Sequence, residues 1–193
     1  MADYAGRATV AVAGKQQVAR LAASLVRPGS TIILDGGTTA LALARALPPD
    51  LACTVITHSP TVASALVGHP VAEVFILGGR LFKHSAVACG AAAVEAAQQV
   101  SAHLCFLGVT GVHPEAGLTT GDADEAAMKR VLAGRAAETY ILASSEKMGA
   151  ASPYRVIALS EVSAILTDAP PESPVIRDLR ALQVRVITAE GAG

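Results

Sequence analysis

The feature that most constrains the fold is a short apolar run that ends in two glycines and leads directly into a helical segment. Residues 31–34 (TIIL) are β-branched and apolar, which is typical of a buried strand. Residues 35–37 (Asp-Gly-Gly) end that strand. The alanines and leucines of residues 38–47 favour a helix, which either of the two threonines at its start can cap. The sequence therefore predicts a helix N-terminus directly after a buried strand.

This turn has the composition of an anion-binding site. The first N–H groups of a helix have no intrahelical partner, and the helix dipole favours negative charge beside them. Glycine lets a ligand approach the backbone closely, and the hydroxyls of Thr38 and Thr39 add donors. Asp35 can accept from a sugar hydroxyl but would repel a phosphate placed on it. The stretch indicates a ligand with both phosphate and hydroxyl groups, although an ordinary strand–helix turn with a good cap fits it equally well.

Similar apolar runs recur along the chain and alternate with helical segments. Strands are expected at residues 53–56, 71–77, 103–109, 139–143, 155–159, 164–167 and 184–188, and further helices at 15–26, 60–67, 91–100, 122–137 and 171–182. Strands that are almost wholly apolar and alternate with helices predict an α/β fold, with a mostly parallel, Rossmann-like sheet covered by helices on both faces. Residues 1–14 show no clear pattern and are expected to be a tether, with one domain over residues 15–193.

The residues that follow the expected strands are polar or glycine-rich at nearly every position. In a parallel sheet the carboxyl ends of the strands lie at one edge, where ligands bind. We therefore expect one pocket there, which a purely structural module would not need. The segments that would meet in it are Asp35 to Thr39, Thr57 to Ser59, Gly78 to Arg80, Thr110-Gly111 and Ser144 to Lys147.

Composition excludes several classes of protein. Hydrophobic residues make up 52% of the 193 residues and charged residues 16%, so part of the surface is expected to be buried between subunits. The net charge of −1, without basic clusters, gives no nucleic-acid footprint, and no apolar run is long enough to span a bilayer. The three cysteines are scattered, as expected of buried thiols in the cytoplasm, and the five histidines lack metal-ligand spacing. No cofactor or metal is expected.

Six motifs occur in an order that resembles a known family. They are LDGGTT, VITHSP, ILGGR, FLGVTGVHPEAGLTT, an acid-rich helix with Glu125 and Lys129, and SEKMG. Over residues 7–190 the chain resembles the effector domain of DeoR-family transcriptional repressors. The resemblance implies a fold similar to ribose-5-phosphate isomerase and CoA transferases. It also implies a homodimer or homotetramer that binds a phosphorylated sugar or related metabolite and thereby controls operator binding by an N-terminal helix-turn-helix.

The resemblance also implies roles for individual residues. Lys147 and Arg80 would neutralise the charge of the ligand, and Asp35 would bind its hydroxyls. His58 stands where the family usually has Asn, and Thr110 and Ser144 also depart from the family pattern. The candidate ligand-binding residues are Asp35, Gly36, Gly37, Thr38, Thr39, Thr57, His58, Gly78, Gly79, Arg80, Gly111, Glu125, Lys129 and Lys147.

Several alternatives remain open from the sequence. Glu125 and Lys129 are spaced i, i+4 and can form a simple helix salt bridge instead of lining a pocket. Arg80 can point into a subunit interface. An isomerase-like enzyme would need a carboxylate base, for which Asp35 and Glu125 are the candidates. The expectation is a sensor and not an enzyme. Contact with DNA is expected only through a helix-turn-helix that this sequence does not contain, and no membrane contact is expected.

Overall fold

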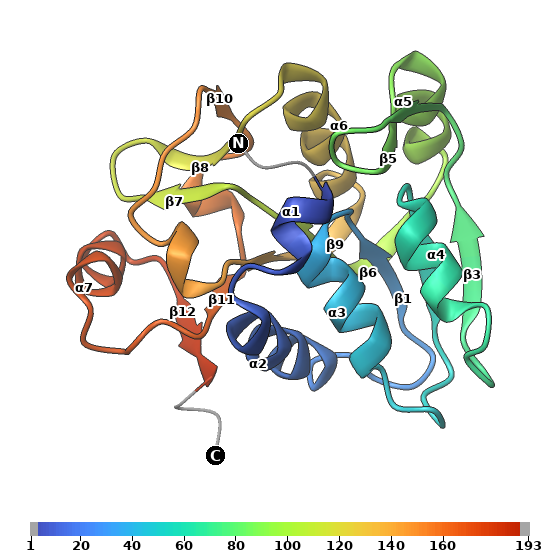
Figure 1. The fold of residues 1–193 in the computed structure, drawn as a ribbon, viewed down its shortest axis with the longest axis horizontal. Coiled ribbons are helices and arrows are strands. Elements are labelled where there is room, and N and C mark those ends of the chain that lie inside the picture. The colour runs from blue at the N-terminus through green and yellow to red at the C-terminus, as the bar shows by residue number, and fades with distance from the viewer. Residues whose placement is uncertain (1–3, 190–193) are drawn as a thin grey trace.

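A seven-stranded sheet forms the centre of the molecule (Figure 1). The computed structural model describes residues 4–189. The strands lie in the order β12-β11-β9-β6-β1-β2-β3, and every neighbouring pair is parallel. In the central register, Ile32 is paired with Val55 on one side and Leu104 on the other. The strands are β1 (Thr31–Leu34), β2 (Thr54–Thr57), β3 (Glu73–Ile76), β6 (Ala102–Gly108), β9 (Ala136–Leu142), β11 (Ala164–Thr167) and β12 (Val186–Thr188).

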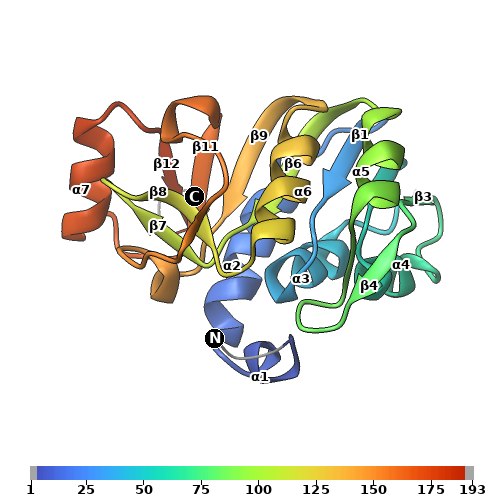
Figure 2. The ribbon, with the colours of Figure 1, turned by 90° about the horizontal axis from the view of Figure 1, so that it is seen from above.

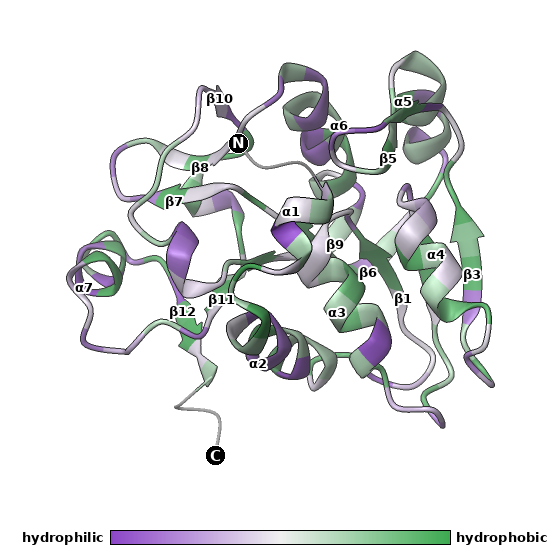
Figure 3. Ribbon diagram, viewed as in Figure 1, coloured by the Kyte–Doolittle hydropathy of each residue, from purple (hydrophilic) through white to green (hydrophobic). Residues whose placement is uncertain are grey.

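Helices bury both faces of this sheet, as the apolar strands predicted. Ile32 and Leu34 of β1 pack with Leu43 on one face, whereas Ile33 packs with Met128 on the other. Because successive strand side chains point to opposite faces, β1 needs an apolar residue at each buried position. Figure 3 shows these apolar strands inside and hydrophilic residues along the outer helices. The first face carries α2 (Val12–Ala23), α3 (Thr38–Ala46) and α4 (Pro60–Leu66), and the second α5 (Ala91–Gln98), α6 (Ala123–Ala133) and α7 (Pro174–Ala181).

The strand order reverses between β1 and β6. From β1 the chain continues outward through β2 and β3, and from β6 it continues the opposite way through β9, β11 and β12. The crevice at such a reversal, beyond the carboxyl ends of the strands, is the usual ligand site of an open parallel sheet. The topology thus places Asp35, which follows β1, beside the residues that follow β6.

Two smaller antiparallel sheets are attached at this edge. One is a hairpin of β4 (Arg80–Phe82) and β5 (Val87–Cys89), and the other contains β7 (Gly111–His113), β8 (Gly117–Thr120) and β10 (Tyr154–Arg155). The strands expected from the sequence include neither the β4–β5 hairpin nor β7 and β8. These strands pair across turns, with Thr119 opposite Gly111 and Arg80 opposite Cys89. The strand expected at 155–159 is also short, since only Tyr154 and Arg155 pair there.

The first residues of the described chain are helical where a tether was expected. A short helix, α1 (Tyr4–Ala8), precedes α2, which begins at Val12 and not at Lys15. Figure 2 shows α1 projecting past α2 and α3 at one edge of the molecule. The expected cap of α3 is also absent, because Gly37 is the N-cap and no side chain accepts a hydrogen bond there. The three cysteines are buried thiols, as expected. Within residues 4–189, none of the helices has both the length and the apolar composition needed to cross a membrane.

Candidate ligand-binding site

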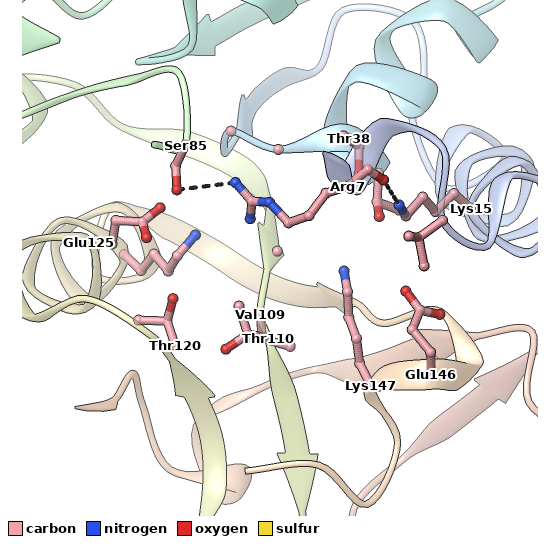
Figure 4. A pocket seen from close by; sticks show the side chains of 16 residues that line it. Arg7, Lys15, Thr38, Ser85, Val109, Thr110, Thr120, Glu125, Glu146 and Lys147 are labelled. Carbon is pink, nitrogen blue, oxygen red and sulfur yellow. Dashed lines mark hydrogen bonds between the residues drawn. The ribbon is translucent and has the colours of Figure 1, made fainter. Parts of the chain in front are cut away.

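A cavity of about 250 Å³ lies at the reversal point between β1 and β6. Its walls come from the start of the chain, the β1–α3 turn, the β4–β5 hairpin, the segment after β6, α6, and the turn after β9 (Figure 4). The lining residues are Arg7, Val10, Lys15, Gly36, Gly37, Thr38, Thr39, Ser85, Gly108, Val109, Thr110, Thr120, Glu125, Lys129, Glu146 and Lys147.

The β1–α3 turn presents backbone donors to this cavity. Gly36 is packed so tightly that a Cβ atom there would lie 2.0 Å from Cγ1 of Val87, and Gly37 has a φ of 102°. The first intrahelical bond of α3 runs from the N–H of Leu41 to the carbonyl of Gly37. The three amides before Leu41 therefore have no intrahelical acceptor, which gives the turn the anion-binding geometry expected from the sequence.

Thr39 adds a hydroxyl without a partner. Its side chain is 3% exposed and lines the cavity, yet its Oγ1 has no hydrogen-bond partner among residues 4–189. A buried polar atom left in this state costs about 1–3 kcal/mol. A ligand oxygen or nitrogen in the cavity would satisfy Thr39 and recover that cost.

Asp35 lies beneath the cavity and does not line it. The carboxylate is fully buried and accepts hydrogen bonds from the N–H of Gly108 (2.9 Å), from Nε2 of His58 (2.8 Å) and from Nζ of Lys129. Burial opposes ionisation, but the charge of Lys129 and the bond from His58 outweigh it and hold the pKa of the Asp35 carboxyl below its usual range. Both oxygens are thus engaged inside the protein, whereas the resemblance implied that Asp35 would bind sugar hydroxyls.

His58 and Thr57 are also buried, like Asp35, and do not face the cavity. Nδ1 of His58 lies 2.7 Å from the carbonyl oxygen of Ala88, and Nε2 faces the Asp35 carboxylate. Both partners are acceptors, so the ring donates from both nitrogens only as an imidazolium. Thr57 is buried, and its Oγ1 accepts from the N–H of Ser59 at 3.1 Å. Neither His58 nor Thr57 lines the cavity.

Helix α6 contributes one charge of each sign. Its N-cap, Asp122, accepts from the N–H of Glu125 at 3.0 Å, which fixes the first turn. Glu125 and Lys129 are both buried and line the cavity. The ion pair of Lys129 is with Asp35, and the salt bridges among residues 4–189 include none between Glu125 and Lys129. Burial opposes the charge of Lys129, but the carboxylates of Asp35 and Glu125 outweigh it and raise the pKa of this lysine.

Lys147 points its ammonium group into the cavity from the 3-10 turn η1 (Ser145–Lys147), as Figure 4 shows. Burial, together with the nearby charges of Lys15, Lys129 and Arg7, lowers the pKa of Lys147 to about 8, against the raising effect of Glu146. The cavity wall therefore holds four basic side chains and the two acids Glu125 and Glu146. This balance favours an anionic ligand.

Half of the predicted site residues line the cavity, and the others lie below or outside it. Arg80 is exposed, and its guanidinium lies 3.9 Å from the Asp124 carboxylate, because the Gly78-Gly79 turn leads outward into β4. Gly111 packs against the backbone of Ala150. The predicted residues that line the cavity are Gly36, Gly37, Thr38, Thr39, Glu125, Lys129 and Lys147, and those that do not are Asp35, Thr57, His58, Gly78, Gly79, Arg80 and Gly111.

The largest omission from the sequence prediction is the start of the chain. Arg7 and Lys15 line the cavity, and Lys15 is 5% exposed although it was expected only as the first residue of an ordinary helix. The signal that could have indicated them is two basic residues in an otherwise apolar segment. Thr110 and Glu146 stand at strand ends that were expected to face the pocket, whereas Ser85 belongs to the unpredicted hairpin.

Comparison with known sequences gives a consistent result. The family model of the DeoR C-terminal sensor domain matches residues 10–169. The chain is 33% identical over 166 residues to the HTH-type transcriptional repressor GlcR of Bacillus subtilis, which covers 86% of this chain and 64% of that protein. It is 27% identical over 165 residues to the glycerol-3-phosphate regulon repressor of Escherichia coli, covering 86% and 66% respectively. The chain thus spans slightly less than two thirds of either relative.

Comparison with solved structures shows the fold. Ribose 5-phosphate isomerase A from Methanocaldococcus jannaschii matches with a TM-score of 0.50 and 19% identity, over 69% of this chain and 52% of the isomerase. eIF2B delta from Chaetomium thermophilum matches with a TM-score of 0.55 and 14% identity, over 81% and 56%. The isomerase-like fold implied by the motifs is confirmed, and at these identities the likeness concerns the fold alone.

Proposed function

We propose, because this chain belongs to the family of DeoR C-terminal sensor domains, that its cavity binds the effector of a transcriptional repressor and that this effector is a phosphorylated sugar or a related metabolite. A ligand-sensing role in regulation follows from the family. The finer proposal is carried by the Thr39 hydroxyl at the N-terminus of α3, which has no hydrogen-bond partner in the described part of the chain and lies in a cavity lined by four basic side chains. Buried donors and positive charge together favour a phosphate group.

The rest of the wall suits the hydroxyl end of such a ligand. The phosphate would accept from the free amides at the start of α3 and from Lys147. On the opposite side, Thr110, Thr120 and the Glu125 carboxylate line the cavity and offer both donors and acceptors. One relative is named for the glycerol-3-phosphate regulon, and glycerol 3-phosphate combines a phosphate with free hydroxyls. Asp35 and His58 would act indirectly, by holding Lys129 and the β1–α3 turn in place.

Assembly of two copies of the chain is part of the proposal. Edge strand β3 has four consecutive exposed residues, and no strand among residues 4–189 pairs with its outer edge. Phe75 is 53% exposed and Ile76 52%, and Leu81 on β4 is 50% exposed. An apolar edge of this kind is covered in stable proteins. We propose that β3 lies in the interface of a homodimer, and that DNA is bound through a helix-turn-helix outside this sequence.

A thermal-shift screen tests the effector proposal. The chain would be heated with phosphorylated sugars and polyols, the matching unphosphorylated compounds, and inorganic phosphate. A ligand at 100 times its Kd adds about 2.7 kcal/mol to the free energy of unfolding. For a chain of this length, that raises Tm by about 5–10 °C. A rise with a phosphorylated compound but not with its free sugar supports the proposal, and an equal response to both contradicts it.

Because the fold resembles that of an isomerase, an enzyme is the alternative function. Glu125 lines the cavity beside Lys129 and is positioned as a general base more favourably than Asp35, whose oxygens are both engaged. Incubation with pentose phosphates, followed by analysis of the products, separates the two functions. A sensor binds without conversion, whereas turnover that is lost in Glu125→Gln would establish the enzyme.

A further inference from the structure

The first described helix lies across the mouth of the cavity, held mainly by polar contacts. None of the residues of α1 is buried. The N–H of Tyr4 donates to the carbonyl of His84 at 2.9 Å, and the Tyr4 hydroxyl donates to Oγ1 of Thr61 at 3.0 Å. With so little apolar surface buried, the position of α1 depends on these bonds and on the charges that meet beneath it.

Arg7 connects α1 to the opposite rim of the cavity. Its Nη2 donates to Oγ of Ser85 at 3.2 Å and to the carbonyl of His84 at 3.4 Å, in the turn of the β4–β5 hairpin. Figure 4 shows the Arg7 side chain crossing the cavity toward Ser85, with the Lys147 ammonium below it. On the near side, Nζ of Lys15 donates to the Arg7 carbonyl. The guanidinium is thereby held over the space that the proposed phosphate would enter.

The basic side chains around this space repel one another when no anion is present. The charges of Lys15, Lys129 and Arg7 all contribute to the lowered pKa of Lys147. An anion between Arg7 and Lys147 would replace this repulsion with attraction to both. The guanidinium is suited to that role because it can donate to two oxygens of one phosphate.

Three residues, 9–11, join α1 to α2. The last of them, Ala11, has a φ of 49° and a ψ of 42°, a left-handed conformation that alanine rarely adopts. A short linker that contains a strained residue can act as a joint, since relaxing that residue changes the angle between the two helices. The position of α1 can therefore respond to what lies beneath Arg7 without a rearrangement of the sheet.

We propose that Arg7 contacts the ligand and that residues 4–11, which include α1, form a strap that a bound phosphate holds in place across the cavity. This inference rests on the proposed function and adds to it a binding residue and a moving part. Ligand binding and closure of the strap are thermodynamically linked. Closure of the strap would therefore raise the affinity for the ligand by the same factor by which the ligand raises the equilibrium constant for closure. Ligand binding would thus change the position of the residues that lie N-terminal to α2.

Calorimetry and hydrogen exchange with inorganic phosphate test this inference. The variants are Arg7→Gln, Lys147→Met and Arg27→Gln, the last removing an arginine that precedes β1 at the opposite end of the sheet. We expect Arg7→Gln to weaken phosphate binding at least tenfold, and Arg27→Gln to leave it unchanged. We expect phosphate to slow amide exchange of residues 4–11 in the wild type and in Arg27→Gln, but not in Arg7→Gln.

The outcomes separate the inference from the proposed function. Phosphate binding that is lost in Lys147→Met but retained in Arg7→Gln overturns the inference and leaves the binding site standing. Unchanged exchange of residues 4–11 in the phosphate-saturated wild type overturns it as well. A wild-type chain that binds neither inorganic phosphate nor any phosphorylated sugar overturns the proposed function, and the inference with it.

Discussion

The ammonium group of Lys129 donates a hydrogen bond to the Asp35 carboxylate, which joins residues 94 positions apart in the sequence. The bond ties the end of the central strand β1 to helix α6 and is fully enclosed, since Asp35 is 0% exposed. His58 and the N–H of Gly108 complete the set of donors around the carboxylate. The cavity therefore lies above a buried charge cluster whose hydrogen bonds are formed within the protein, without a ligand.

We expect Lys129→Met to lower the free energy of unfolding by about 3 kcal/mol, because it leaves the buried Asp35 charge with one cationic partner fewer. The double variant Asp35→Asn/Lys129→Met should lose less than the sum of the two single variants. Urea denaturation of all four proteins measures this coupling. Lys83→Met, at an exposed lysine, is the control and should stay within about 0.5 kcal/mol. Additive losses would show that the pair does not act as a unit.

Binding of an anionic ligand should weaken as pH rises through about 8. The pKa of Lys147 is lowered to about 8 in the unliganded protein, so the lysine loses its charge above this pH. An anion favours the protonated lysine, and binding near pH 8 should therefore take up protons. Calorimetry in two buffers of different ionisation enthalpy measures the uptake. Uptake that persists in Lys147→Met would assign it to another group.

The lowered pKa of Lys147 also predicts the direction in which the free energy of unfolding changes with pH. Between about pH 8 and the unfolded-chain value near 10.4, the unfolded lysine binds a proton that the folded one has lost. Stability without ligand should therefore gain a contribution from Lys147 as pH rises across this window. The gain should be absent in Lys147→Met when urea denaturation is compared at pH 7.5 and 9.5.

Thr39→Val should separate stability from binding. The substitution removes a buried hydroxyl that has no partner in the described chain, so stability without ligand should be unchanged or higher by about 1 kcal/mol. Affinity for the phosphorylated ligand should fall about tenfold, the equivalent of one charge-assisted hydrogen bond. Thr167→Val is the matched control, because the buried Thr167 hydroxyl accepts from the N–H of Ala169 and its removal should cost stability. Equal stability losses in both variants would mean that Thr39 has a structural partner.

Phe75→Asp should convert the proposed dimer to a monomer. Phe75 is half-exposed on edge strand β3, where a carboxylate would have to be buried against the second copy. Sedimentation velocity measures the mass directly, and circular dichroism checks that the fold is kept. Tyr154→Asp, which changes an exposed aromatic residue on β10, should leave the mass of the assembly unchanged. A wild-type monomer, or a dimer that tolerates Phe75→Asp, would place the interface elsewhere.

The central sheet could be predicted from the sequence because its signals are local. Ile32, Ile33 and Leu34 are buried on both faces of the sheet, and that requirement makes this part of the strand apolar. β8 was missed because glycine and threonine dominate it, and the β4–β5 hairpin was missed because each of its strands has only three residues. The pairing of these strands depends on contacts across the turns, and strands this short carry little periodicity.

The site was harder to predict for the opposite reason, since its partners are distant in the sequence. Spacing alone pairs Lys129 with Glu125 one turn away, whereas the fold pairs it with Asp35. Arg7 reaches Ser85, 78 positions later in the chain. The turn after β1, helix α6 and Lys147 line one cavity, but which side chains face that cavity depends on packing that the motifs do not reveal.

The buried position of Asp35 bears on how specificity can diverge among related sensors. A carboxylate whose charge is balanced from within imposes no choice of ligand, so the Asp-Gly-Gly turn and its lysine can persist while the ligand changes. Relatives that share these residues are therefore expected to share the buried charge cluster around Asp35 but to differ in the ligands that they bind. Differences in effector choice should be sought at Thr110, Thr120 and Glu146, where substitutions alter the cavity wall and leave that charge cluster intact.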